Sequence, residues 1–248
     1  MIFKMMKLII DIGNTRIKVA VVHNCDILHS KVYDSITEDD VRDIVARYPA
    51  TAAIVSSTRG NSDTVCDMLR PHVAHVVNFS PATTPIPLGN DYHTPQTLGA
   101  DRLAAAVGCA ALYPEHDIMI VDFGTAITID YVIDGRYRGG NISPGVTTRF
   151  RALADYTAKL PLCTATEEVL PYGRTTVEAI EQGVMRGVEN EIRGYVEAFY
   201  VEKQKKCVIF TGGDAKYFVK RIKNAIFADC EPVIYGLATI LEYDAEKL

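Results

Sequence analysis

Two short segments of the sequence each place an aspartate, a glycine and a hydroxyl at the end of an apolar run. The first runs from Asp11 through Gly13 to Thr15, and the second from Asp122 to Thr125. Glycine lets the backbone turn and lets a phosphate approach the amides closely. A carboxylate at a strand end can hold a cation or its bound water, and Lys18 could meet phosphate charge. Either turn alone could be an ordinary hairpin, but two facing turns would hold a polyphosphate from both sides.

A third candidate site is Gly99-Ala100-Asp101-Arg102, at the expected start of an alanine-rich helix. An acidic residue at a helix N-terminus often only compensates the helix dipole. Asp101 could instead accept a proton from an attacking hydroxyl. Arg102 could hold a carboxylate or stabilise a transferring phosphoryl group.

Two further segments have both a structural and a functional interpretation. Gly212 and Gly213 follow a buried apolar run, so they form either a tight strand-to-helix turn or a flat surface for a ring such as adenine. Thr175-Thr176-Val177-Glu178 has the pattern of a capping box. A hydroxyl at that helix start could also contact a ligand.

The two aspartate turns belong to one repeated unit of strand, turn and returning strand. It occupies Lys7 to Val22 and again Ile118 to Val132, and the two copies lie about half the chain apart. Such a repeat predicts two homologous domains, although any two hairpins share some of this pattern. We place the domains at residues 1–115 and 116–248.

The remaining pattern alternates strands with helices, which is typical of an α/β fold. Between residues 80 and 95, four prolines indicate a loop. Helices are expected over 37–48, 62–69, 98–113, 148–159 and 176–202, and further strands over 52–56, 75–79 and 207–210.

The composition excludes several classes of protein. Of 248 residues, 48% are hydrophobic and 23% charged, and the net charge is −5; this suits a folded core and argues against a nucleic-acid partner. No apolar run reaches the length of a membrane span, and Met6 could be an alternative start. The widely spaced cysteines show no zinc or disulfide pattern and indicate reduced thiols in the cytoplasm. They are Cys25, Cys66, Cys109, Cys163, Cys207 and Cys230.

Taken together, five motifs resemble type III pantothenate kinase, a family of the acetate kinase, sugar kinase, heat-shock chaperone and actin superfamily. They appear in the family's order and span nearly the whole chain. GADR, preceded by Tyr92 and Pro95, is the most specific of them. The motifs are DIGNTRIK from Asp11, GADR from Gly99, DFGTAITID from Asp122, GGNISPG from Gly139 and TGGDA from Thr211.

The resemblance implies two duplicated RNase H-like (actin-like ATPase) domains with an interdomain nucleotide cleft. It also implies an activity: transfer of the γ-phosphate of ATP to pantothenate, which gives 4'-phosphopantothenate in the first step of coenzyme A biosynthesis. The family requires Mg²⁺ and a monovalent cation, K⁺ or NH₄⁺, and acts as a homodimer.

The same resemblance assigns roles to individual residues. Asp101 would be the general base, Asp122 would ligate the monovalent cation, and Asp11 would serve Mg²⁺ directly or through water. Pantothenate would be bound by Tyr92, Gly99, Ala100, Asp101, Arg102 and, from the dimer partner, Thr176. ATP would be bound by Asp11, Ile12, Gly13, Asn14, Thr15, Arg16, Ile17, Lys18, Thr125, Gly212 and Gly213. One departure is Thr175, where the family often has asparagine before the threonine.

Two other functions remain open at this stage. The chain could be another kinase or phosphatase of the same superfamily, acting on an acid or a sugar, or a non-enzymatic regulator that kept the fold. The presence of Asp11, Asp101 and Asp122 together favours an enzyme, because a pure binding module need not retain all three.

Overall fold

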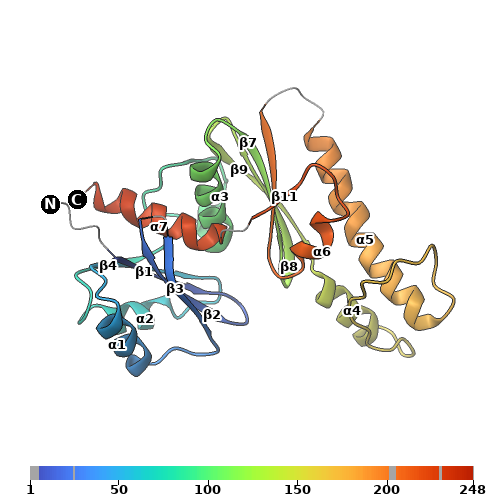
Figure 1. Ribbon diagram of the computed structural model, residues 1–248, viewed down its shortest axis with the longest axis horizontal. Coiled ribbons are helices and arrows are strands. Elements are labelled where there is room, and N and C mark those ends of the chain that lie inside the picture. Colours follow the sequence, from blue (N-terminus) through green and yellow to red (C-terminus); the bar gives the residue numbers. More distant parts are fainter. Residues whose placement is uncertain (1–5, 25, 201–204, 229–230, 248) are drawn as a thin grey trace. The chain divides into compact units, whose positions relative to one another are not determined.

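The computed structural model describes residues 6–24, 26–200, 205–228 and 231–247. The chain forms two compact units (Figure 1). Unit 1 comprises Met1–Pro114 and Cys230–Leu248, and unit 2 comprises Glu115–Asp229. The end of the helix expected over 176–202 lies outside the described ranges, as do Cys25, Cys230 and the residues before the alternative start at Met6.

Unit 1 is built on a five-stranded sheet. In space the order is β3-β2-β1-β4-β5. β1 pairs antiparallel with β2 and parallel with β4, β2 pairs antiparallel with β3, and β4 pairs parallel with β5. The strands are β1 (Met6–Ile12), β2 (Ile17–His23), β3 (Asp26–Tyr33), β4 (Ala52–Ser57) and β5 (His75–Asn78).

Unit 2 repeats this topology strand for strand. Its strands lie in the order β9-β8-β7-β10-β11, with the same antiparallel and parallel pairings. The predicted duplication is therefore confirmed. The strands are β7 (Asp117–Phe123), β8 (Ala126–Ile133), β9 (Arg136–Pro144), β10 (Lys206–Thr211) and β11 (Ile226–Phe227).

The helices alternate with the strands, as expected for an α/β fold. All five predicted helices are present, although α4 begins and ends earlier than the expected 148–159. The proline-rich segment contains only the short strand β6 (Gly89–Asn90) and a 3₁₀ turn (Pro95–Thr97). The helices are α1 (Glu38–Arg47), α2 (Ser62–Leu69), α3 (Ala100–Leu112), α4 (Val146–Asp155), α5 (Thr176–Phe199), α6 (Ala215–Val219) and α7 (Pro232–Ala245).

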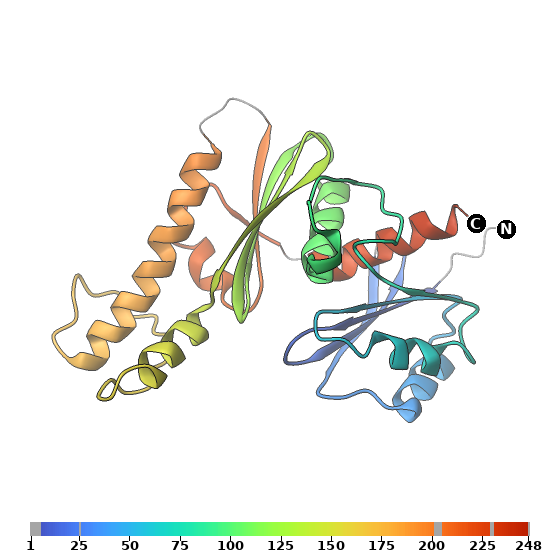
Figure 2. The ribbon, with the colours of Figure 1, turned by 180° about the vertical axis from the view of Figure 1, so that it is seen from behind.

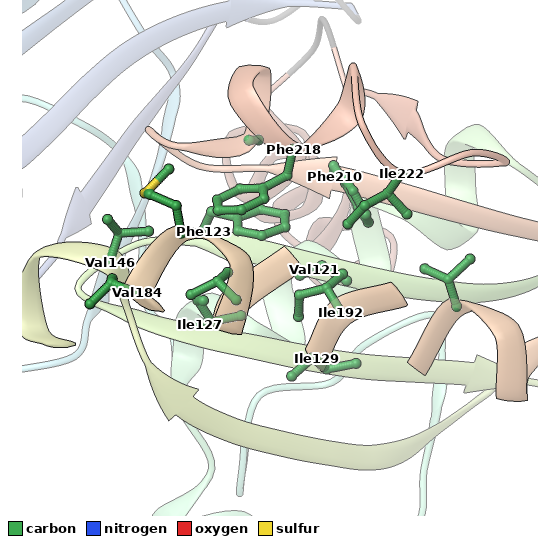
Figure 3. Packing of buried hydrophobic residues seen from close by; sticks show 14 of the residues in the cluster. Val121, Phe123, Ile127, Ile129, Val146, Val184, Ile192, Phe210, Phe218 and Ile222 are labelled. Atoms are coloured by element: carbon green, nitrogen blue, oxygen red, sulfur yellow. The ribbon is translucent and has the colours of Figure 1, made fainter. Parts of the chain in front are cut away.

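Each unit has its own hydrophobic core on one face of its sheet. In unit 1, Leu8, Ile10 and Ile12 of β1 belong to a core cluster that includes side chains of α1 and α2. In unit 2, alternate residues of β7 pack with α5 and α6 (Figure 3). There Phe123 stacks on Phe218 with ring centroids 4.8 Å apart. Because side chains alternate along a strand, the polar residues between these positions face the opposite side of each sheet.

The opposite face of the unit 1 sheet is covered by α3 and α7, which pack closely on each other. A Cβ on Gly236 would lie 1.8 Å from the carbonyl oxygen of Ala104, and one on Gly108 would lie 2.3 Å from that of Pro232. Only glycine allows this approach. The second domain expected at 116–248 therefore differs from unit 2 at its end, because α7 packs with unit 1.

The described cysteines agree with reduced thiols. Cys66, Cys109, Cys163 and Cys207 are buried and form no disulfide among the described residues, and burial raises the pKa of the Cys66 thiol to about 11. Within the described ranges, no helix has both the length and the apolar character needed to cross a membrane.

Candidate functional site

Asp11 lies at the carboxyl-terminal end of β1, on the sheet face that α3 and α7 cover. Its cross-strand partners are Lys18 in β2 and Ser56 in β4. Residues paired in this way project from the same face of a sheet. The structure therefore brings a carboxylate, an ammonium and a hydroxyl together at one edge of unit 1.

The turn after Asp11 is short and mostly exposed. The amide of Gly13 donates to the carbonyl oxygen of Arg16 at 3.0 Å, and residues 14–16 are exposed. Ile12 and Ile17 flank the turn, but their side chains belong to the core. These two predicted ATP-binding residues can therefore offer only backbone groups to a ligand.

Lys18 has a further partner that the sequence did not reveal. Its Nζ lies 3.1 Å from Oε1 of Glu231, the residue that precedes α7. Pro232 in the first turn of that helix is a typical start signal. The pattern could have located the helix, but not the contact with Lys18.

The GADR motif forms a compact group of its own in unit 1. Asp101 lies in the first turn of α3, and its Oδ1 accepts a hydrogen bond from the Arg102 amide at 2.8 Å. Arg102 is buried, and its guanidinium lies 5.9 Å from the centroid of the Tyr92 ring. A Cβ on Gly99 would approach Asp101 Oδ1 to 2.6 Å, so glycine allows the carboxylate its present position. The predicted pantothenate-binding residues of this segment thus lie together.

Asp122 occupies the place in unit 2 that Asp11 occupies in unit 1. It is the second-last residue of β7, with Thr128 and Thr211 as cross-strand partners. Gly212 has φ +94° and lies so close that a Cβ would be 2.4 Å from Asp122 Oδ1. The predicted cation ligand and one predicted adenosine neighbour are therefore in direct proximity.

Thr125 is held by the start of α4. Its carbonyl oxygen accepts hydrogen bonds from the Gly145 amide at 3.0 Å and from Thr148 Oγ1 at 2.7 Å. A Cβ on Gly145 would lie 2.1 Å from the Gly124 carbonyl oxygen. The glycine-rich run before α4 thus supports the second aspartate turn, and Thr148 is a supporting residue that the sequence patterns did not indicate.

Thr176 begins α5, and the predicted cap precedes it. Thr175 Oγ1 accepts a hydrogen bond from the Glu178 amide at 3.2 Å. Thr176 lines a groove of about 770 Å³ between α4 and α5, together with Arg149, Leu153, Tyr156, Ile180 and Val184. The structure places Thr176 within unit 2, in this groove.

Comparison with known proteins gives one family. The family model for type III pantothenate kinase matches residues 7–198. A type III pantothenate kinase from Phocaeicola vulgatus is 40% identical over 240 residues, covering 96% of this chain and 99% of that protein.

Two solved structures share the fold at lower sequence identity. A Baf family protein from Campylobacter jejuni aligns with a TM-score of 0.63 and 20% identity, covering 96% of this chain and 99% of that one. A ROK family protein from Streptococcus pneumoniae aligns with a TM-score of 0.53 and 14% identity, covering 98% and 100%. These likenesses show the duplicated, actin-like fold.

Proposed function

The chain belongs to the type III pantothenate kinase family and is an ATP-dependent kinase of pantothenate; we propose that its two aspartate turns and Asp101 carry the reaction. The reaction moves the γ-phosphate of ATP to pantothenate and gives 4'-phosphopantothenate in coenzyme A biosynthesis. Phosphoryl transfer depends on alignment and charge neutralisation more than on covalent chemistry. The residues of this chain are proposed to supply both.

The observation that supports this proposal most strongly is the equivalence of Asp11 and Asp122. Each is the second-last residue of the corresponding strand, β1 or β7, and the five strands of each unit follow the same order. A carboxylate followed by a glycine turn at the carboxyl end of such a strand suits phosphate and cation binding. An ordinary hairpin would not require the carboxylate at the same place twice.

For the acceptor hydroxyl, we propose Asp101 as general base. The carboxylate is fixed at the start of α3 by the Arg102 amide, and from there it would take the proton of the pantothenate hydroxyl. The buried Arg102 and the nearby Tyr92 offer a cation and a hydroxyl for the carboxylate and amide groups of pantothenate. Gly99 and Ala100, which directly precede Asp101, are proposed to border the substrate chain.

Asp11 has the donor chemistry that Mg²⁺ needs. No group of three or more histidine, cysteine, aspartate or glutamate side chains gathers as a metal site in the part of the chain the structure describes. Magnesium commonly uses one or two carboxylates with water and substrate phosphates, which agrees with Asp11 as its protein ligand. When bound, the ion neutralises phosphate charge, and Lys18 would add a further positive charge on the same face.

Asp122 is the proposed ligand of a monovalent cation, K⁺ or NH₄⁺. The neighbouring carbonyl oxygen of Phe123 lies within 2.7 Å of the position that a Gly212 Cβ would take. Carboxylate and carbonyl oxygens are hard ligands suited to such ions. Thr125, Gly212 and Gly213 would then border the nucleotide, as the motifs imply.

A second copy of the chain is the proposed partner of the groove between α4 and α5. Figure 2 shows the backbone of these two helices, α4 in yellow-green and α5 in light orange. The surrounding segment exposes large apolar residues: Tyr156 is 89% exposed, Leu162 64% and Val177 44%. Exposed apolar patches of this kind indicate an interaction surface. A homodimer would cover these residues and would give Thr176 its proposed place at the partner's pantothenate site. The buried cysteines that form no disulfide among the described residues support a cytoplasmic location.

The cation assignment can be tested with purified protein and Mg-ATP in KCl, NH₄Cl and NaCl at equal ionic strength. We expect pantothenate-dependent ADP release in K⁺ and NH₄⁺ and little in Na⁺. Equal rates in all three salts would remove the monovalent cation from the Asp122 site.

A further inference from the structure

Lys18 and Glu231 form an ion pair at the edge of unit 1 that carries Asp11. The distance from Lys18 Nζ to Glu231 Oε1 is 3.1 Å, and the two side chains are 37% and 38% exposed. Asp11 lies directly across from Lys18 in the β1–β2 pair. Two carboxylates therefore neighbour Lys18: that of Asp11, its cross-strand partner, and that of Glu231 at the start of α7.

Glu231 uses only one of its oxygens within the described protein. Its Oε2 is buried and has no hydrogen-bond partner there. Leaving a buried carboxylate oxygen without a donor costs stability. Ser56 Oγ, on the same sheet face, is likewise buried without a partner. Polar groups kept in this condition are typical of a functional site, where local rules of stability are broken.

A second lysine–glutamate pair connects the other end of α7 to the same sheet. Lys7, at the start of β1, pairs with Glu242, near the end of α7. α7 thus has a salt bridge to the sheet at each end, since Glu231 reaches β2 and Glu242 reaches β1. The Lys7–Glu242 pair has the same chemistry as the Lys18–Glu231 pair but lies at the opposite end of β1 from Asp11. It therefore serves as a control for the structural effect of losing such a pair.

Lysine is a flexible residue whose ammonium must be held to act at a defined point. The partial positive charge at the N-terminus of α7 favours a carboxylate at position 231. We propose that Glu231 is a positioning residue that holds the Lys18 ammonium beside Asp11 for the phosphates of ATP. This inference rests on the proposed role of Lys18 in phosphate binding.

Two variants separate this role from simple stabilisation of α7. Glu231→Asp keeps a negative charge and a good helix cap, but its shorter side chain draws Lys18 away. Glu231→Gln keeps the length and loses the charge. We expect both to lower kcat/KM for ATP about tenfold, with KM for pantothenate unchanged, and we expect the loss to vanish in a Lys18→Met background.

Glu242→Gln is the control, because it removes the equivalent ion pair at the other end of α7. It should leave both kinetic parameters unchanged, whatever it does to the thermal midpoint. A Glu231→Asp variant with wild-type kinetics would overturn the proposal. A higher kcat/KM for ATP in Glu231→Gln would also overturn it, because Glu231 would then compete with phosphate for Lys18.

Binding of a non-hydrolysable ATP analogue, measured by calorimetry without pantothenate, gives a readout independent of turnover. The Glu231 variants should bind the analogue more weakly and AMP equally well. Equal analogue binding in all variants would overturn the proposal. A wild-type protein that binds the analogue but does not phosphorylate pantothenate would refute the proposed function instead.

Discussion

Gly212 shows at the scale of one residue how the backbone makes room for the side chain of Asp122, the proposed cation ligand. Its φ of +94° is unfavourable for other residues, and a Cβ would meet Asp122 Oδ1 at 2.4 Å and the Phe123 amide nitrogen at 2.6 Å. The carboxylate of Asp122 can rest against the end of β10 only because this Cβ is missing. Gly213 has no neighbour within 4 Å of such a Cβ.

Replacing Gly212 by alanine should therefore damage both the fold and the proposed cation site. We expect the free energy of unfolding to fall by about 1–3 kcal/mol and the K⁺ concentration for half-maximal activity to rise. Urea denaturation and a K⁺ titration measure the two effects. For Gly213→Ala, the matched control, unfolding should change by less than about 0.5 kcal/mol; equal destabilisation by both would refute this account of Gly212.

The sequence patterns could indicate only candidate residues that stand in a local motif. Asp11, Asp101 and Asp122 each lie two residues from a glycine, and the structure places them near strand or helix ends. Glu231 and Ser56 could not be found in this way. Their proximity to Lys18 and Asp11 arises from strand pairing and helix packing, which no local spacing encodes.

At the scale of elements, predictions succeeded where one face of a helix or strand is buried. α1, which was predicted, begins with a capping box in which Thr37 and Asp40 each accept a hydrogen bond from the other's backbone amide. No residue range was predicted for β3, because it is almost entirely exposed and therefore has no alternation of apolar residues. α7 was not predicted because it is apolar on several sides, which removes the amphipathic period on which such predictions depend.

The contact between α3 and α7 predicts a strong effect of a single methyl group. Gly236→Ala would place a Cβ 1.8 Å from the Ala104 carbonyl oxygen, so the two helices must separate. We expect a loss of about 1–3 kcal/mol in the free energy of unfolding, measured with urea.

Gly194→Ala is the control for this experiment. Gly194 lies inside α5 with nothing within 4 Å of a Cβ, so alanine should stabilise by about 0.5–1 kcal/mol. A Gly236→Ala protein as stable as the wild type would show that the α3–α7 contact is looser than described.

At the scale of the whole molecule, the repeat predicted two similar domains, but it did not predict that the last helix, α7, belongs to unit 1. The duplicated sheets follow from two similar strand patterns about half the chain apart. The return of α7 to unit 1 depends on tertiary contacts with α3 and β1. The sequence pattern was therefore enough to predict the two sheets, whereas the position of the last helix in unit 1 is seen only in the structure.

The proposed dimer gives a prediction at this scale. Val177, beside the α4–α5 groove, and Val32, on β3, are both 44% exposed. Light scattering should find a dimer for the wild type and for Val32→Asp, and a folded monomer for Val177→Asp. A dimeric Val177→Asp protein would place the interface elsewhere.

The central claim is that this chain phosphorylates pantothenate with Asp101 as the base. The most direct measurement is formation of 4'-phosphopantothenate from pantothenate and Mg-ATP in K⁺ by the wild type and by Asp101→Asn. We predict one ADP per product for the wild type. The folded, ATP-binding variant should lose about 10²–10⁴-fold in kcat. No product from folded wild-type protein, or equal turnover by both proteins, would contradict the account.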